Sequence, residues 1–295
     1  MPGPVWWAST DATPPQFLLT KGNKMTNING LIEGMSNSDY HAHHDYVSSS
    51  YLKTLINSTP NRATFERLTP KESDAMAFGT AVHCAVLEPE EFARTYKPFP
   101  KIDKRTKAGK EEYEKFLSSL SQDGVAIDCE DYEKIATLVR NLDNQPIIAN
   151  KLIECHKREV SIFDSSSNPK LRCRFDAWDG KGMVIDIKTM REPASEVNFR
   201  KAVTTFGYGL QAAFYRLVAR RVGITINDFG FICLETTAPY EVAAFVLDSS
   251  LLDLYEAQLT PVLANLTTGG TWPDTFKVIG LTNWQIKSSE LEVTF

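Results

Sequence analysis

The chain has 295 residues, of which 42% are hydrophobic and 23% charged, and its formal net charge at pH 7 is −5. These values exclude a disordered chain, and no run of about 18 apolar residues occurs, so we expect neither a membrane-spanning helix nor a membrane partner. The acidic balance lacks the basic footprint of most nucleic-acid-binding proteins, although a local basic groove is compatible with it. The five cysteines are widely spaced without a Cys-x-x-Cys pair, which favours reduced thiols in a cytoplasmic protein over a disulfide framework or a zinc ribbon.

The N-terminal part is predicted to be an arm followed by helices. Residues 1–30 are rich in Pro, Thr, Gly and Asn without periodicity, so we expect a poorly ordered arm there and one domain over residues 31–295. Ser48–Ser50 predicts the N-cap of a short helix. Residues 73–87 are apolar nearly all round, which predicts a buried helix with His83 at its middle.

The run Lys97–Lys110 contains six lysines and arginines and prolines near its start, which predicts a mobile basic loop. This loop either binds a nucleic-acid backbone or is simply a solvated surface loop. Further helices are expected at 107–121, at 129–142, from Ala194, at Tyr208–Val222 and at 249–266, and strands at 157–164, 171–178, 182–188, Phe229–Glu235 and Glu241–Leu247. The helix Tyr208–Val222 is predicted to be strongly amphipathic. This order predicts an α/β core with a helical N-terminal part, whereas the tail from Trp272 has no clear pattern.

The segment Arg172–Lys188 predicts a β-hairpin, because two alternating runs flank the turn sequence Gly180–Gly182. Alternation puts Asp186 and Lys188 on one face of their strand. With that turn, Asp176 lies opposite Asp186, so two carboxylates and an ammonium converge on one face. Such carboxylates suit a hard cation such as Mg²⁺, and the lysine can hold a water or a phosphate oxygen beside it. This set of groups is typical of metal-assisted phosphodiester hydrolysis.

A second interpretation of the hairpin is a pair of solvated surface charges, which are common on half-exposed strands. The run Met183–Ile187 is nevertheless apolar enough for a buried central strand. Burying Asp186 and Lys188 there costs several kcal/mol unless they are paired or hold a metal, which favours the metal site.

Four more side chains are candidates for the same site. His83 is either a hydrogen-bonded core histidine or, if its helix packs over the hairpin, a third metal ligand. Glu159 is either a surface acid at the start of its strand or a further member of the carboxylate cluster. Gln211 and Tyr215 share a helix face and either contact a phosphate or nucleotide or make a helix–helix hydrogen bond. Phosphate-loop and nucleophile-elbow motifs do not occur, so ATP use and acyl hydrolysis find no support.

Several of these motifs resemble known nuclease families. Asp176 followed by Asp186-Ile187-Lys188 resembles the core of the PD-(D/E)XK (RecB-like) nuclease superfamily. The helix Phe78–Pro89 is similar to the Gly-Thr-Ala-x-His … Leu-Glu-Pro helix of the C-terminal nuclease family of RecE (exonuclease VIII). The segments Asn37–His41 and Ser48–Lys53 resemble that family's opening, and Gln211–Tyr215 is similar to its Gln-x-x-x-Tyr motif. The resemblance covers roughly residues 35–290 and implies a central mixed sheet flanked by helices.

The resemblance implies a Mg²⁺-dependent 5′→3′ exodeoxyribonuclease, in which Mn²⁺ would substitute. Such an enzyme degrades one strand of linear double-stranded DNA from its ends and leaves 3′ single-stranded tails for recombination by strand annealing. The implied metal ligands are His83, Asp176, Asp186 and the Ile187 carbonyl. The implied catalytic residues are Lys188, which would orient or deprotonate the attacking water, with Asp186, Asp176 and Glu159. The implied DNA-binding residues are Gln211, Tyr215 and Arg174.

The same resemblance implies partners and a setting. Double-stranded DNA ends would be the substrate, the enzyme would be a toroidal homotetramer, and a RecT-like single-strand annealing protein would act beside it in the cytoplasm of a bacterial host cell. Exonuclease VIII carries a long N-terminal extension and this chain only a short arm, from which we expect a stand-alone phage or prophage enzyme.

Three alternative functions stay open from the sequence. The same core fits a structure-specific or endo-acting nuclease, because polarity and end requirement depend on the shape of the channel. A non-catalytic DNA-end-binding protein is another class, although the complete set Asp176, Asp186 and Lys188 argues against a decayed site. The third is a metal-stabilised structural domain without a DNA role.

Overall fold

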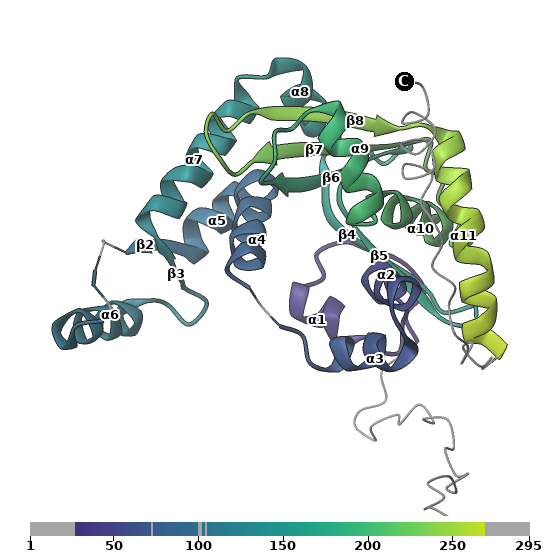
Figure 1. Ribbon diagram of the computed structural model, residues 1–295, viewed down its shortest axis with the longest axis horizontal. Coiled ribbons are helices and arrows are strands. Elements are labelled where there is room, and N and C mark those ends of the chain that lie inside the picture. Colours follow the sequence, from purple (N-terminus) through teal and green to yellow (C-terminus); the bar gives the residue numbers. More distant parts are fainter. Residues whose placement is uncertain (1–26, 72, 100–101, 104, 269–295) are drawn as a thin grey trace, which may run out of the picture.

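The computed structural model describes residues 27–71, 73–99, 102–103 and 105–268. Its centre is a six-stranded sheet in the order β1-β4-β5-β6-β7-β8 (Figure 1). The strands are β1 (Gly30–Ile32), β4 (Lys157–Asp164), β5 (Leu171–Trp178), β6 (Met183–Met190), β7 (Asp228–Glu235) and β8 (Val242–Leu247). Strands β6 and β7 run parallel and the other neighbours antiparallel, so the sheet is mixed, and the predicted α/β fold with helices around a mixed sheet is confirmed.

Helices cover both faces of this sheet. They are α1 (Asn37–Ala42), α2 (Ser49–Asn57), α3 (Pro60–Leu68), α4 (Asp74–Leu87), α5 (Pro89–Thr95), α6 (Lys107–Ser119), α7 (Cys129–Asp143), α8 (Pro146–Glu154), α9 (Glu196–Thr205), α10 (Tyr208–Arg221) and α11 (Ser249–Thr268). Helix α10 packs on β4 and β5 and is itself covered by α2, α9 and α11, whereas α4 and α7 pack on the other face. A small parallel sheet, β2 (Tyr96–Phe99) with β3 (Val125–Asp128), carries α6 away from the main body (Figure 1).

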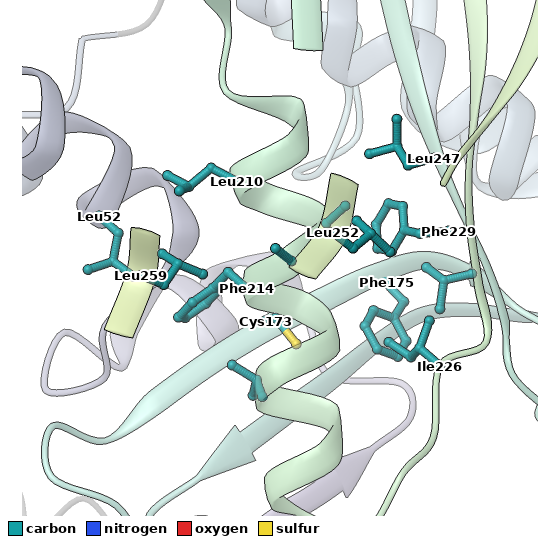
Figure 2. Close-up of a cluster of buried hydrophobic side chains, with 14 of the residues drawn as sticks. Leu52, Cys173, Phe175, Leu210, Phe214, Ile226, Phe229, Leu247, Leu252 and Leu259 are labelled. Carbon is teal, nitrogen blue, oxygen red and sulfur yellow. The ribbon is translucent and has the colours of Figure 1, made fainter. Parts of the chain in front are cut away.

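The larger apolar core lies under α10. Figure 2 shows Phe214 of α10 among side chains from β5, β7, α2 and α11. Phe214, Phe175 and Phe229 are fully buried. Removing a buried aromatic ring of this kind costs about 3–5 kcal/mol, so this cluster holds α10 firmly against the sheet. The position of α10 matters below because Gln211 is on it.

The β5–β6 turn has the predicted form. The Asp179 N–H donates to the Met183 carbonyl (3.1 Å), which leaves Gly180–Gly182 as the loop. The Asp179 carboxylate accepts the N–H groups of Lys181, Gly182 and Met183 at 2.7–2.9 Å. Gly182 has φ +145°, and a Cβ there would meet the Asn227 amide at 2.4 Å, so only glycine fits.

Two predicted helices differ from the sequence interpretation. Helix α4 is buried only in its second half, and its first turns are exposed because they border a cleft rather than the core. Helix α10 is not strongly amphipathic but mostly buried, because α11 covers its outer side, where Arg216 and Arg220 pair with Glu256. The predicted loop Lys97–Lys110 includes the end of β2 and the start of α6.

All five cysteines are free thiols, as predicted. No helix in the described part of the chain is long and apolar enough to cross a bilayer. Most of the predicted arm over 1–30 and the tail from Trp272 lie outside the described residues. The division into an arm and a domain over 31–295 therefore stays a prediction, although Gly30 already opens β1.

Candidate active site

The sheet forks between β5 and β6. These strands pair only at Ala177↔Ile185 and Trp178↔Val184, whereas β6 pairs with β7 along its whole length. Beyond Ile185 the edge of β6 is therefore free of β5. At the mouth of the fork the Ile187 N–H donates to the Asp176 carboxylate at 2.7 Å instead of to a strand carbonyl.

Three acidic residues line up across β4, β5 and β6 at this fork. The pairs Arg158↔Ala177 and Val160↔Phe175 bracket Glu159 and Asp176. The β5–β6 register places Asp176 opposite Asp186, as the turn predicted. Glu159 has a φ of +49°, a left-handed conformation that is rare for a non-glycine residue and is typically found at functional sites. The fork therefore brings the three carboxylates to one level of the sheet.

His83 completes a group that fits a divalent metal. Its Nδ1 lies 3.4 Å from the Asp176 carboxylate. Ligand atoms of His83, Glu159 and Asp176 all lie within 4.8 Å of one another. Two carboxylates and one imidazole are donors that suit Mn²⁺ and, through the oxygens, Mg²⁺. The predicted ligand His83 thus lies beside Asp176. The third member of this group is Glu159, whereas the resemblance implies Asp186 as the third ligand side chain.

The electrostatics of the fork favour a bound cation. Burial first, and then the neighbouring Asp176 carboxylate, raises the pKa of Glu159 to about 8. Burial and Asp186 raise the pKa of Asp176 to about 6, against the opposing effects of His83 and Lys188. In both groups burial, and then a neighbouring carboxylate, disfavours the charged form, and a bound cation would favour it.

Asp186 and Lys188 form a buried pair beside this group. The Lys188 ammonium lies 2.6 Å from Asp186 Oδ2, and the Asp186 side chain is 2% exposed. Gln211 of α10 donates its amide to Asp186 Oδ1 at 2.6 Å. Burial opposes the lysine charge, but Asp186 and Asp176 outweigh it and raise the pKa of Lys188, so Lys188 keeps its proton at neutral pH. Gln211 therefore orients Asp186 from the face of the sheet that α10 covers.

Two predicted DNA-binding residues have partners inside the protein. The Arg174 side chain is 8% exposed and lies 3.6 Å from Glu159. It also donates to Ser161 Oγ and to the Met35 carbonyl. Tyr215 packs its ring against Phe175 and Phe229. In the described part of the chain these contacts give both residues a positioning role, and a DNA contact by either stays a prediction.

A cleft of about 1500 Å³ opens at the fork. Its acidic wall consists of Glu88 and Glu91 at the α4–α5 junction, next to Glu159 and Asp176. Its basic wall contains Lys53 of α2, Arg191 after β6 and Lys201 of α9 with the adjoining Phe206, and Glu192 lines the cleft next to Arg191. None of the described residues of Lys97–Lys110 lines the cleft, so its positive charge has another source than the predicted basic loop.

Sequence reasoning missed Lys53, Phe206 and Tyr208 as cleft residues. The ring of Tyr208 lies under Lys188, with the ammonium 5.0 Å from the ring centroid. Tyr208 and Phe206 flank Gly207, whose φ of +66° begins α10. The only signal for Lys53 was its place in a segment that resembles a nuclease opening, and no local pattern marks the two aromatic residues.

Residues 48–275 match the family described as PDDEXK-like domain of unknown function (DUF3799). The chain belongs to this family. The match contains the fork, with Glu159, Asp176, Asp186 and Lys188 in it. The family description and the cluster of His83, Glu159 and Asp176 together support a nuclease that uses a divalent metal.

The fold also matches a solved structure. The chain is similar to a crystal structure from Eubacterium rectale described as a "Putative exonuclease", with a TM-score of 0.53 and 13% sequence identity. The alignment covers 88% of this chain and 99% of that one. At this identity the likeness establishes the fold. No curated protein matches the chain in sequence.

Proposed function

We propose that this chain is a divalent-metal-dependent deoxyribonuclease that removes nucleotides 5′→3′ from the ends of linear double-stranded DNA and uses Mg²⁺, with Mn²⁺ as a substitute. The observation that carries the proposal is the fork, where Glu159, Asp176 and Asp186 meet at one level of the sheet beside His83 and Lys188. Acids with raised pKa values next to a buried lysine, in an open cleft, are typical of a hydrolytic site.

His83, Glu159 and Asp176 would hold the metal, with Asp186 and the Ile187 carbonyl on its β6 side. A divalent ion there would supply Lewis acidity towards the phosphate and a more acidic bound water. Lys188 would keep a positive charge where negative charge builds up on the oxygens of the pentacoordinate phosphate, and it would donate to the phosphate or the water instead of acting as the base. Gln211 fixes the Asp186 carboxylate so that Lys188 is held in place.

The proposal extends to biology that follows from the resemblance. The 3′ tails left by the enzyme would be substrates for a RecT-like single-strand annealing protein in a bacterial cell, as in phage recombination. A toroidal homotetramer would hold the duplex while one strand enters the cleft of a subunit. The basic wall of the cleft, on an otherwise acidic chain, supports binding of DNA at the cleft without non-specific binding of nucleic acid over the rest of the surface.

Linear and circular duplexes, labelled separately at the 5′ and 3′ ends, test the proposal with Mg²⁺, Mn²⁺ or EDTA. We expect metal-dependent release of nucleotides from the 5′ ends of linear DNA only, lost in Asp186→Ala. Cutting of circles would instead identify an endonuclease. Tight DNA-end binding without hydrolysis in any metal would identify a non-catalytic binding protein, and metal-dependent thermal stabilisation without DNA binding would identify a structural metal domain.

A further inference from the structure

The basic wall of the cleft holds three cations without an ion pair among the described residues. Lys53, Arg191 and Lys201 have no ion pair within the described part of the chain, whereas Lys188 is paired with Asp186. Lys201 lies on the α9 face that lines the cleft, together with Asn198, Ala202 and Thr205, at helical spacing. Unpaired cations along one wall are available to successive phosphates of a strand.

Lys53 is built into this wall rather than free in solvent. Its aliphatic stem passes over Gly207, where a Cβ would meet the Lys53 Cδ at 2.7 Å. Its ammonium donates to the Phe206 carbonyl at 3.4 Å, which leaves further N–H donors for a ligand. Burial, and then the nearby charge of Lys188, lowers the pKa of Lys53. Lys53 thus lies against Gly207 and Lys188 over the ring of the next residue, Tyr208, so the two lysines can act on one stretch of backbone.

Phe206 presents an aromatic ring beside these cations. It is 60% exposed, although it lies in the cleft and follows directly on α9. Its ring is 5.8 Å from that of Tyr208, which in turn lies under Lys188. An exposed ring next to unpaired cations is the arrangement on which an unpaired base stacks while its phosphate is held, and each stacked base contributes about 1–3 kcal/mol.

We propose that Phe206 and Lys53, with Lys201, form a nucleotide subsite in which the base next to the scissile position stacks on Phe206 and its phosphate binds Lys53. The inference deepens the proposed function and rests on it, because it places the strand along the α2–α9 wall. It follows that the bound nucleotide is unpaired and that recognition is independent of base identity, since every base has a π-face.

Equilibrium binding with modified DNA tests the subsite separately from hydrolysis. Fluorescence anisotropy is measured with Asp186→Asn protein, so that strands stay intact, and with an abasic nucleotide placed in turn at each of the first few positions from either end. We expect one position where loss of the base weakens binding about 5- to 150-fold, and Phe206→Ala to weaken binding of unmodified DNA equally. Phe206→Ala should then add nothing on DNA that is abasic at that position.

A neutral methylphosphonate scan tests Lys53 in the same way. Lys53→Met should remove the sensitivity to one methylphosphonate and no other. Phe65→Ala, with a ring 54% exposed on α3, and Lys181→Met, in the β5–β6 turn, are matched controls outside the cleft. Equal effects of Phe206→Ala on intact and abasic DNA, or none, would overturn the subsite. If wild-type protein hydrolyses nothing while these couplings hold, the proposed hydrolysis fails, and Phe206 and Lys53 stand only as a binding site for an unpaired nucleotide.

Discussion

Asp179 and Asp176 lie on the same hairpin, Asp179 at its closed end and Asp176 at the fork, and the protein shifts their pKa values in opposite directions. Asp179 accepts three backbone N–H groups, and these bonds outweigh burial and lower its pKa. Asp176 accepts one, from Ile187, and burial followed by the neighbouring Asp186 carboxylate outweighs this bond and raises its pKa to about 6. One carboxylate is satisfied by the protein and the other is left in need of a cation.

The difference shows how one local structure serves two purposes. The closed end fixes the register, and the register then forces carboxylates together at the open end, where the protein supplies too few donors for them. The raised pKa of Asp176 fits the proposed metal site, and the lowered pKa of Asp179 fits a structural turn.

Replacing each aspartate with the isosteric asparagine should show the largest difference between the two ends of the hairpin in their effects on activity and stability. Asp176→Asn should lower the rate of hydrolysis about 1000-fold or more, because a ligand and its charge are lost, while the metal-free protein stays at least as stable. Asp179→Asn should lower the free energy of unfolding by about 1 kcal/mol and change the rate only a few-fold. Single-turnover rates and urea unfolding of both variants measure this. A slow Asp179→Asn enzyme with normal stability would break the comparison.

The two lysines of the hairpin provide the next contrast. Lys188→Met should lower kcat by about 100- to 1000-fold, because the site loses the charge that stabilises the transition state. Lys188→Arg should keep part of the rate. Lys181→Met, on the exposed turn, should leave the rate unchanged, and a comparable loss there would point to long-range charge instead of a local role.

The sequence predicted the arrangement of Asp176, Asp186 and Lys188, because strand periodicity and a glycine turn determine a hairpin register locally. It left the place of Glu159 open, because the Ser/Asn/Pro segment between β4 and β5 marks a loop but does not determine the register of the two strands. It also missed β1, β2 and β3, which have three or four residues and are too short to show a period. The fork itself is the point where β5–β6 pairing stops after two residue pairs, and no local pattern marks that point.

Gln211 links the fork to the core through its bond to Asp186. Gln211→Ala should raise the Mg²⁺ concentration for half-maximal activity about 10- to 100-fold, because the carboxylate loses the donor that orients it. Metal titrations of the rate measure this, with Gln258→Ala on the exposed side of α11 as the control. An unchanged metal requirement with a lower kcat would assign Gln211 to the substrate instead.

The pH dependence of stability should have opposite signs at the two ends. The raised pKa values of Glu159 and Asp176 mean that the folded state favours the protonated forms of both side chains. Their contribution to the free energy of unfolding is therefore complete below their unfolded pKa values. It is lost as the pH rises through about 6 for Asp176 and about 8 for Glu159. The lowered pKa of Asp179 stabilises the fold above its unfolded pKa and loses this effect only in acid. In EDTA, Tm should fall between pH 5 and pH 9, and Mg²⁺ should reverse most of the fall.

Glu159→Gln is the control for this pH effect, since it removes the group with the highest raised pKa among the fork acids. Its Tm should decline less with pH than that of the wild type in EDTA, and Mg²⁺ should stabilise it less. Identical pH profiles for the two proteins would show that the fork does not hold uncompensated negative charge.

Anomalous diffraction from crystals soaked in Mn²⁺ tests the central claim most directly. The account predicts a peak between His83, Glu159 and Asp176 in wild-type protein and in Asp179→Asn, and no peak at that position in Asp176→Asn. A fork that stays empty at saturating Mn²⁺, or a peak at the Asp179 turn instead, would contradict the assignment of the open end of the hairpin as the metal centre.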